Sequence, residues 1–228
     1  AVPSRYPVGA CQRNPRHRRR LDGQRAKVLG HQVVQVVLAA SARDGLRLQR
    51  HHLEVVLQAT TAEDRVKPLE QLRILRRDAC RILGITDLRF LGIRDKTTEF
   101  LDREELALRL KGIIEEIRPS LIITYHPQYS VHPDHMALGA ATVRAVELMD
   151  PADRPPVHTR AFGKASVVLG EPDLAVDVSA VLDTKMEAIK AHRSQSENMM
   201  SKMASDPAFR ERMERDRSLE RYWIWQFA

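Results

Sequence analysis

The sequence has little cysteine, few aromatic residues and no long apolar run. Its two cysteines, Cys11 and Cys80, are too few for the disulfide framework of a small secreted domain. No stretch of 18 apolar residues is present, and the arginine-rich N-terminal residues do not resemble a signal peptide. We therefore expect a cytoplasmic protein with no membrane partner, and its 228 residues suffice for one α/β core.

The first 67 residues lack Ile, Met, Phe and Trp altogether, and only Tyr6 among them is aromatic. They hold 13 of the 37 Lys and Arg but only 5 of the 30 Asp and Glu. The net charge of +7 therefore belongs to this segment, because the 24 basic and 25 acidic residues that follow nearly cancel. A near-neutral body has no nucleic-acid footprint, so nucleic acid is not the expected partner of the main part of the chain.

We divide the chain into an atypical arginine-rich segment, residues 1–67, and a regular domain, residues 68–228. Residues 31–40 contain four β-branched valines and are able to form a strand. Three interpretations of the first segment stay open. It is a disordered basic tail, a divergent first βα unit that has lost its chemistry, or a translation in the wrong reading frame that joins the proper one between residues 69 and 77.

From residue 68 onward, strand and helix patterns alternate. Apolar spacing predicts helices over 69–83, 102–117, from 134 to about 149, 181–203 and 207–221. Strands are predicted over 88–93, 121–124, 161–169 and 174–178, with a strand-like end at 222–227. This alternation predicts an α/β fold with a doubly wound, mostly parallel sheet and helices on both faces, Rossmann-like except for an atypical first βα unit.

The stretch that carries most of the chemistry joins the strand at 121–124 to the next helix. It reads Tyr129-Ser-Val-His-Pro-Asp-His135, after a predicted loop at 126–131. Open α/β sheets bind ligands just beyond the carboxyl ends of their strands. Two histidines three residues apart at a helix start are able to point at one centre, either as metal ligands or as acid–base groups.

Four segments resemble the PIG-L/LmbE family of zinc-dependent N-acetylglucosaminyl deacetylases, and within it the deacetylases of bacillithiol biosynthesis. They are residues 78–96, 119–125, 129–135 and 191–195, in the family's order. The resemblance implies hydrolysis of an N-acetyl amide of a small sugar conjugate, N-acetylglucosaminyl malate, with zinc as cofactor. The family's opening motif, His-Pro-Asp-Asp-Glu, supplies two metal ligands and the catalytic base, and it is absent from this sequence.

The resemblance also assigns roles to single residues. His135 is implied as a zinc ligand, and His132 as the group that stabilises the oxyanion or passes a proton. Asp134 would hold a histidine's second ring nitrogen, or would serve only as a charge at a helix N-terminus. Arg94 and Asp95 follow a strand end and would bind the anionic aglycone and the sugar hydroxyls.

His192, on the long helix near Gln195, would form a polar wall of the same pocket. His126 is interpreted as an ordinary loop residue. His51 and Glu54 are chemically close to the missing pair, but they lie in a helix-like stretch and are a weak substitute.

Three functions therefore compete. The first is the zinc-dependent deacetylase, either active or inactive in this chain. The second is an inactive family member that binds a sugar conjugate or a partner, and the third is a nucleic-acid binder that uses its basic N-terminal segment. A homo-oligomer is compatible with each of them.

Overall fold

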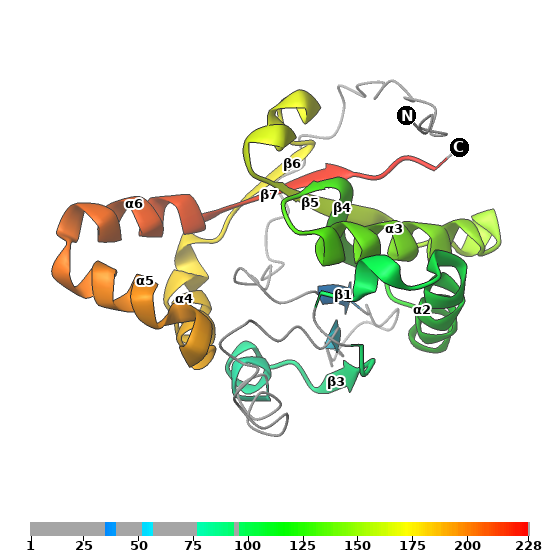
Figure 1. The fold of residues 1–228 in the computed structure, drawn as a ribbon, viewed down its shortest axis with the longest axis horizontal. Coiled ribbons are helices and arrows are strands. Elements are labelled where there is room, and N and C mark those ends of the chain that lie inside the picture. The colour runs from blue at the N-terminus through cyan, green and yellow to red at the C-terminus, as the bar shows by residue number, and fades with distance from the viewer. Residues whose placement is uncertain (1–34, 40–51, 57–76, 94–95, 228) are drawn as a thin grey trace, which may run out of the picture.

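The structure is a computed structural model that describes residues 35–39, 52–56, 77–93 and 96–227. Seven strands form one sheet in the order β3-β2-β1-β4-β5-β7-β6 (Figure 1). Their bounds are Gln35–Ala39 (β1), His52–Val56 (β2), Asp87–Phe90 (β3), Leu121–Ser130 (β4), Val157–Phe162 (β5), Leu174–Asp177 (β6) and Leu219–Ile224 (β7). The α/β class predicted from the sequence is confirmed.

The sheet is mixed rather than mostly parallel, so that part of the prediction is wrong. Only β2 with β3 and β4 with β5 run parallel, whereas β1 is antiparallel to both β2 and β4. At the other edge, β7 is antiparallel to both β5 and β6. Two parallel neighbouring strands need a crossover connection, and α3 is that connection between β4 and β5. Strands that are neighbours without a crossover connection can run antiparallel. The doubly wound, Rossmann-like arrangement stays a prediction.

Helices cover both faces of the sheet at β4. Ile122 is fully buried in the main core, with Leu110 and Ile114 of α2 (Arg103–Ile117) and Leu138 of α3 (Pro133–Glu147). The next residue, Ile123, points the other way and packs with Leu83 of the helical residues 77–83 and Ala188 of α4 (Leu182–Ala191). Successive residues of a strand point to opposite faces of the sheet, so two successive apolar residues are buried only if helices pack on both faces.

The ends of α2 follow from its sequence. The Asp102 carboxylate accepts a hydrogen bond from the Glu105 N–H at 2.8 Å, which satisfies one of the free donors of the first turn. At the other end Arg118 adopts a left-handed conformation, and Pro119 follows it. The helix predicted over 102–117 is confirmed, with Asp102 as its N-cap.

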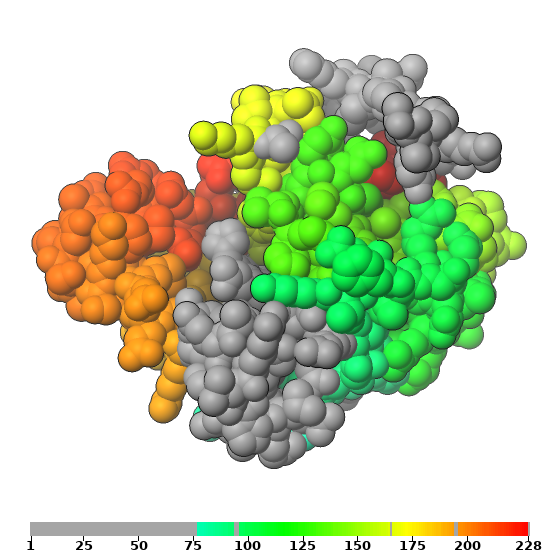
Figure 2. All heavy atoms as spheres, viewed as in Figure 1, coloured from blue at the N-terminus to red at the C-terminus, as the bar shows by residue number. Residues whose placement is uncertain are grey.

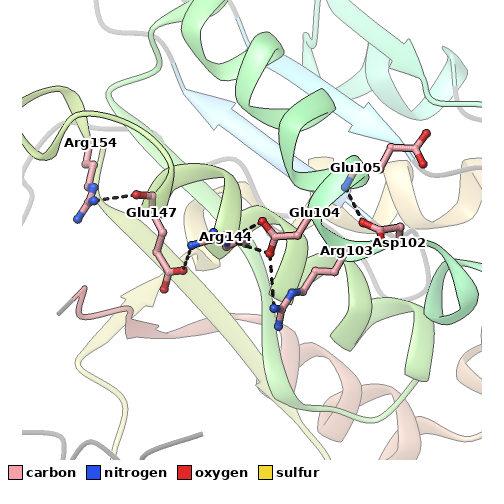
Figure 3. A network of polar contacts seen from close by, with 7 residues as sticks. All are labelled: Asp102, Arg103, Glu104, Glu105, Arg144, Glu147 and Arg154. Atoms are coloured by element: carbon pink, nitrogen blue, oxygen red, sulfur yellow. Dashed lines mark hydrogen bonds and ion pairs between the residues drawn. The ribbon is translucent and has the colours of Figure 1, made fainter. Parts of the chain in front are cut away.

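Ion pairs on the surface connect α2 to α3 (Figure 3). Arg144 Nε donates to both carboxylate oxygens of Glu104 at 2.9 Å, and its Nη1 reaches Glu147 at 3.4 Å. Arg154 in turn donates to the Glu147 carbonyl at 2.7 Å. The α2–α3 contact therefore has an apolar interior and a charged rim.

Several predicted boundaries are wrong. Residues 126–130 continue β4 past an irregularity in its pairing with β5, where a loop was expected. Residues 164–169 form a 3-10 helix, η4 (Lys164–Leu169), where the strand at 161–169 was expected. The single helix predicted over 181–203 is two helices, α4 and α5 (Arg193–Ser205), which meet at His192. The backbone angles of His192, φ −83° and ψ 59°, break the helical geometry.

Other predicted elements are confirmed. β6 falls within the predicted strand 174–178, whereas β3 begins one residue before the predicted strand 88–93 and ends three residues short of it. The described residues 77–83 of the helix predicted at 69–83 are helical. The charged tail forms α6 (Pro207–Arg217), but the predicted end at 221 is wrong, because β7 already begins at Leu219, three residues before the predicted strand-like end. The helices α4, α5 and α6 stand out as a lobe beside the sheet (Figure 2). Two short 3-10 helices, η3 (Pro151–Asp153) and η5 (Ser179–Val181), complete the connections.

The first 67 residues contribute two strands to the interior of the sheet. β1 lies between β2 and β4, and β2 pairs with β3, so the sheet of residues 68–228 is joined through both of them. His52 and Glu54 lie in β2, so the helix-like interpretation of this stretch is wrong, while His51 lies outside the described residues. The domain boundary at residue 67 stays a prediction. No helix in the described ranges is both long and apolar enough to cross a membrane.

Candidate active site at the start of α3

The turn between β4 and α3 presents His132 at the first position of the helix. His132 is the N-cap of α3, and its Nδ1 accepts a hydrogen bond from the Asp134 N–H at 3.2 Å. Because Nδ1 acts as acceptor, the neutral ring carries its proton on Nε2. His132 therefore offers an N–H donor at the end of a helix where backbone donors also gather.

Val131, just before this histidine, has a left-handed backbone with φ of 65° and an exposed side chain. A β-branched residue is strained in that conformation, and such strain concentrates at functional sites. Gly163 lies against it, since a Cβ there would come within 2.9 Å of a Val131 methyl group. The sequence contained no signal for this conformation or for the contact with Gly163, which is distant in the chain.

His135 is a half-buried neutral histidine with a fixed orientation. Its ring stacks on Tyr125, with centroids 4.1 Å apart and planes 8° from parallel. Its Nδ1 lies 3.3 Å from the Ser130 carbonyl oxygen, which only accepts, so Nδ1 carries the proton and Nε2 the lone pair. Burial, with a smaller contribution from the charge of His132, lowers the pKa of His135 to about 4. A metal-binding histidine has this protonation state and an outer hydrogen bond of this kind.

The two histidine rings lie close together, as predicted, with centroids 5.3 Å apart. A zinc site needs three protein ligands, and no group of three His, Cys, Asp or Glu side chains lies together among the described residues. His135 fits one ligand position by its tautomer and charge. The described part of the chain does not complete the set.

Asp134 does not contact a histidine ring in the way that the sequence suggested. Its side chain is 1% exposed, and its two oxygens accept the backbone N–H groups of Lys96 at 2.6 Å and Thr98 at 3.1 Å. Lys96 has a left-handed backbone with φ of 58°, so this carboxylate stabilises an unusual turn. Asp134 therefore ties the segment after β3 to the start of α3.

The structure does not bring the other predicted site residues, Arg94, Asp95 and His192, next to the histidine pair in its described part. Arg94 and Asp95 lie outside the described residues, immediately before the turn that Asp134 holds. His192 is the junction of α4 and α5, and its carbonyl oxygen accepts from the N–H and the hydroxyl of Ser196. The contacts of α4 and α5 are mainly with each other, with η5 and with α6. The predicted place of His192 in the wall of the histidine site stays a prediction.

His126, interpreted as an ordinary loop residue, is in fact buried within β4. Its Nδ1 accepts from the Gln128 N–H at 3.1 Å, and its ring packs near Tyr129 and Trp225. Burial lowers the pKa of His126 from 6.5 to about 4. It is a neutral histidine that belongs to the packing behind the site.

This burial predicts a pH dependence of stability. Because the folded pKa of His126 lies below its ordinary value, the unfolded chain binds more protons between pH 6.5 and 4. The stabilising contribution is complete above pH 6.5 and is lost as pH falls toward 4. We expect urea unfolding of the wild type to lose about 1–2 kcal/mol more between pH 7 and pH 5 than unfolding of His126→Gln. Equal losses in both proteins would contradict this assignment.

Comparison with known proteins agrees with the resemblance found in the sequence. The family model described as PIG-L, GlcNAc-PI de-N-acetylase, matches residues 24–146. The chain belongs to the PIG-L family. The match contains His132, Asp134 and His135 and extends upstream through β1 and β2, whereas the resemblance found in the sequence began near residue 69.

Curated relatives lie within the same family. A probable N-acetyl-alpha-D-glucosaminyl L-malate deacetylase 2 of Bacillus cereus is 50% identical over 125 residues, 54% of this chain and 57% of the relative. Its Bacillus subtilis counterpart is 44% identical over 139 residues, 59% of this chain and 63% of the relative. The alignments thus span about 60% of the length of these relatives.

Solved structures show the same fold. The N,N'-diacetylchitobiose deacetylase of Pyrococcus horikoshii superposes with a TM-score of 0.55 at 21% identity, covering 76% of this chain and 72% of that one. A conserved protein of Thermus thermophilus gives 0.54 at 23% identity, covering 74% and 80%.

Proposed function

We propose that the histidine pair at the start of α3 forms one half of a deacetylase centre that removes the acetyl group from an N-acetylglucosaminyl conjugate. The malate conjugate is the proposed substrate, zinc the proposed cofactor and the cytoplasm the proposed location. The observation that carries this proposal is the fixed pair of tautomers in the family's matched region. His135 has an Nε2 lone pair and His132 has an Nε2–H, with ring centroids 5.3 Å apart.

The proposed roles follow from these tautomers. His135 would be a metal ligand through Nε2, held in place by the Ser130 carbonyl and the Tyr125 ring. His132 would donate a hydrogen bond from Nε2–H to the acyl oxygen as negative charge develops there. To pass a proton to the departing amine, the ring would first have to take up a second proton, for example from the attacking water. Asp134 would act as a positioning residue, because both of its oxygens are engaged by the backbone of the 96–98 turn. Arg94 and Asp95, next to that turn, are the proposed contacts to the conjugate.

The missing motif decides what the chain does by itself. We expect the purified 228-residue protein to hold less than stoichiometric zinc and to release no acetate, because His135 alone does not make a zinc site. We expect a chimera in which residues 1–67 are replaced by a family segment with His-Pro-Asp-Asp-Glu to gain both properties. Metal analysis and an acetate-release assay on N-acetylglucosaminyl malate measure this.

Two variants of the chimera test the division of roles. His135→Ala should lose zinc, whereas His132→Ala should keep zinc and lose rate by on the order of 100-fold or more. Equal zinc loss in both variants would contradict the assigned roles. If the original protein bound one zinc per chain and released acetate, residues 1–67 would have to supply the missing ligands and base. His51 and Glu54 would then be the first residues to substitute.

The absence of His-Pro-Asp-Asp-Glu also favours a second candidate function, an inactive family member that still binds the sugar conjugate. Saturable binding of the conjugate by the original protein, without zinc or turnover, would support this alternative. The near-neutral charge of residues 68–228 gives no such support to nucleic-acid binding.

A further inference from the structure

A second polar site lies in a cavity of about 280 Å³ beside β5 and β7. Its wall is formed by the end of β5 and the start of η4, by Lys185 of α4, and by the chain from the end of α6 through β7. Four of its lining residues are basic and two are acidic: Arg160, Lys185, Arg217, Arg221, Asp216 and Glu220. The cavity therefore carries a surplus of positive charge.

One buried carboxylate serves two of these cations. Glu220 is 1% exposed and forms ion pairs with the Lys185 ammonium and, at 2.5 Å, with the Arg160 guanidinium. Lys185 also donates to the Arg217 carbonyl at 2.6 Å. A single negative charge is thus divided between two positive charges in a largely desolvated place, where unbalanced charge is costly.

Arg217 forms no ion pair with a carboxylate among the described residues, although the charges of Asp216 and Glu220 act on it. Among the described residues its side chain donates only to two thioether sulfurs, those of Met213 at 3.0 Å and Met199 at 3.1 Å. Thioethers are weak acceptors, and its buried Nε has no partner in the described part of the chain. Burial lowers the pKa of Arg217. The indole N–H of Trp223, also in the cavity wall, is buried without a hydrogen-bond partner among the described residues.

We propose that this cavity binds a small oxyanion, a carboxylate or a phosphate group, with Arg217 as its main cationic contact. An oxyanion would supply the strong acceptor that the guanidinium lacks, in a cavity whose four basic residues are accompanied by only two acidic ones, Asp216 and Glu220. It would also bring an acceptor into the cavity whose wall contains the Trp223 indole. The proposal stands whether or not the chain is an active deacetylase.

Two aromatic residues, Phe162 and Tyr125, connect the wall of the cavity to His135. Phe162 lines it, lies under the Arg160 guanidinium and pairs across the sheet with Ser130, whose carbonyl orients His135. The Phe162 ring is 6.2 Å from the Tyr125 ring, on which His135 stacks. The oxyanion is therefore either the charged end of a conjugate that reaches from the histidines or a separate small anion.

Calorimetric titration of the full chain tests the proposal with L-malate and inorganic phosphate as probes and N-acetylglucosamine as the neutral control. We expect saturable binding of at least one anion, and weakening by on the order of tenfold or more in Arg217→Met. Arg215→Met, an exposed change of the same charge on the same helix, should leave the affinity within about twofold. Tighter binding of N-acetylglucosaminyl malate than of either malate or phosphate would identify the conjugate as the source of the anion.

Thermal unfolding of the same variants separates a ligand site from a structural arginine. Methionine extends the apolar cluster of Met199 and Met213, so Arg217→Met should unfold at the same temperature as the wild type or a higher one. The proposal is overturned if no anion saturates the wild type, if Arg215→Met and Arg217→Met weaken binding equally, or if Arg217→Met lowers the unfolding temperature by several degrees.

Discussion

Gly139→Ala should destabilise this protein by about 3 kcal/mol or more, the upper range for overpacking against rigid atoms. Gly139 lies where α3 crosses β4, and a Cβ there would come within 2.2 Å of the Tyr125 carbonyl oxygen and 3.0 Å of its carbon. Both are backbone atoms, so no rotamer change relieves the contact. The helix would have to move away from the strand that orients both histidines.

Urea unfolding measures this effect, and α2 provides a matched control. Gly112 is also a helical glycine, but a Cβ there meets nothing within 4 Å. Because alanine is the better helix former, Gly112→Ala should stabilise the protein by about 0.5–1 kcal/mol. If both substitutions destabilised the protein, the loss at Gly139 would come from placing alanine inside a helix and not from the short distance between α3 and β4. No loss at Gly139 would contradict the α3–β4 packing.

Glu220→Gln should cost about 3–5 kcal/mol, the usual effect of removing one partner of a buried ion pair. The Glu220 carboxylate is 1% exposed and serves both Lys185, which is 4% exposed, and Arg160. Glutamine keeps the shape and one acceptor oxygen but removes the negative charge that the buried Lys185 ammonium and the half-buried Arg160 guanidinium share. The expected loss is therefore electrostatic and not one of volume.

The exposed pair of Glu187 and Lys190, on the same helix as Lys185, is the control. Its atoms are 2.6 Å apart, but both side chains are more than half exposed. Solvent and salt screen such a pair, so Glu187→Gln should change the free energy of unfolding by at most about 0.5 kcal/mol. Chemical denaturation at two salt concentrations compares the variants. If Glu220→Gln were as mild as the control, the Glu220 cluster would not be a buried one.

Local signals predicted the elements that have clear caps and periods. The Asp102 cap and the apolar spacing of Leu106, Leu110, Ile113 and Ile117 correctly placed α2, although Ile114 rather than Ile113 is its fully buried isoleucine. The β-branched run after Pro119 correctly began β4. The predicted strand at 161–169 failed because Val167 and Val168 are exposed on a 3-10 turn, so their β propensity is not used. The prediction of one continuous helix across residue 192 was wrong because the break at His192 has no proline or glycine that would have indicated it.

In the candidate site, too, some features were predictable from local sequence and others were not. Residue type and spacing predicted that His132 and His135 would face one centre, because a helix start brings positions three apart onto one side. The partner of Asp134 was not predictable, since Lys96 and Thr98 reach it from a turn almost forty residues earlier. The same holds for Tyr125 beneath His135 and for the charge pairs of Glu220, which depend on how distant strands are paired.

By itself, the sequence determined the α/β class, the family and the histidine pair, because these depend on composition, local periodicity and a short motif. Only the tertiary structure decided the directions of the strands, the tautomers of both histidines and the cationic cavity at Arg217. A strand's direction and a side chain's partner depend on contacts between segments far apart in the chain. Periodicity within one segment contains no information about which segment will lie beside it.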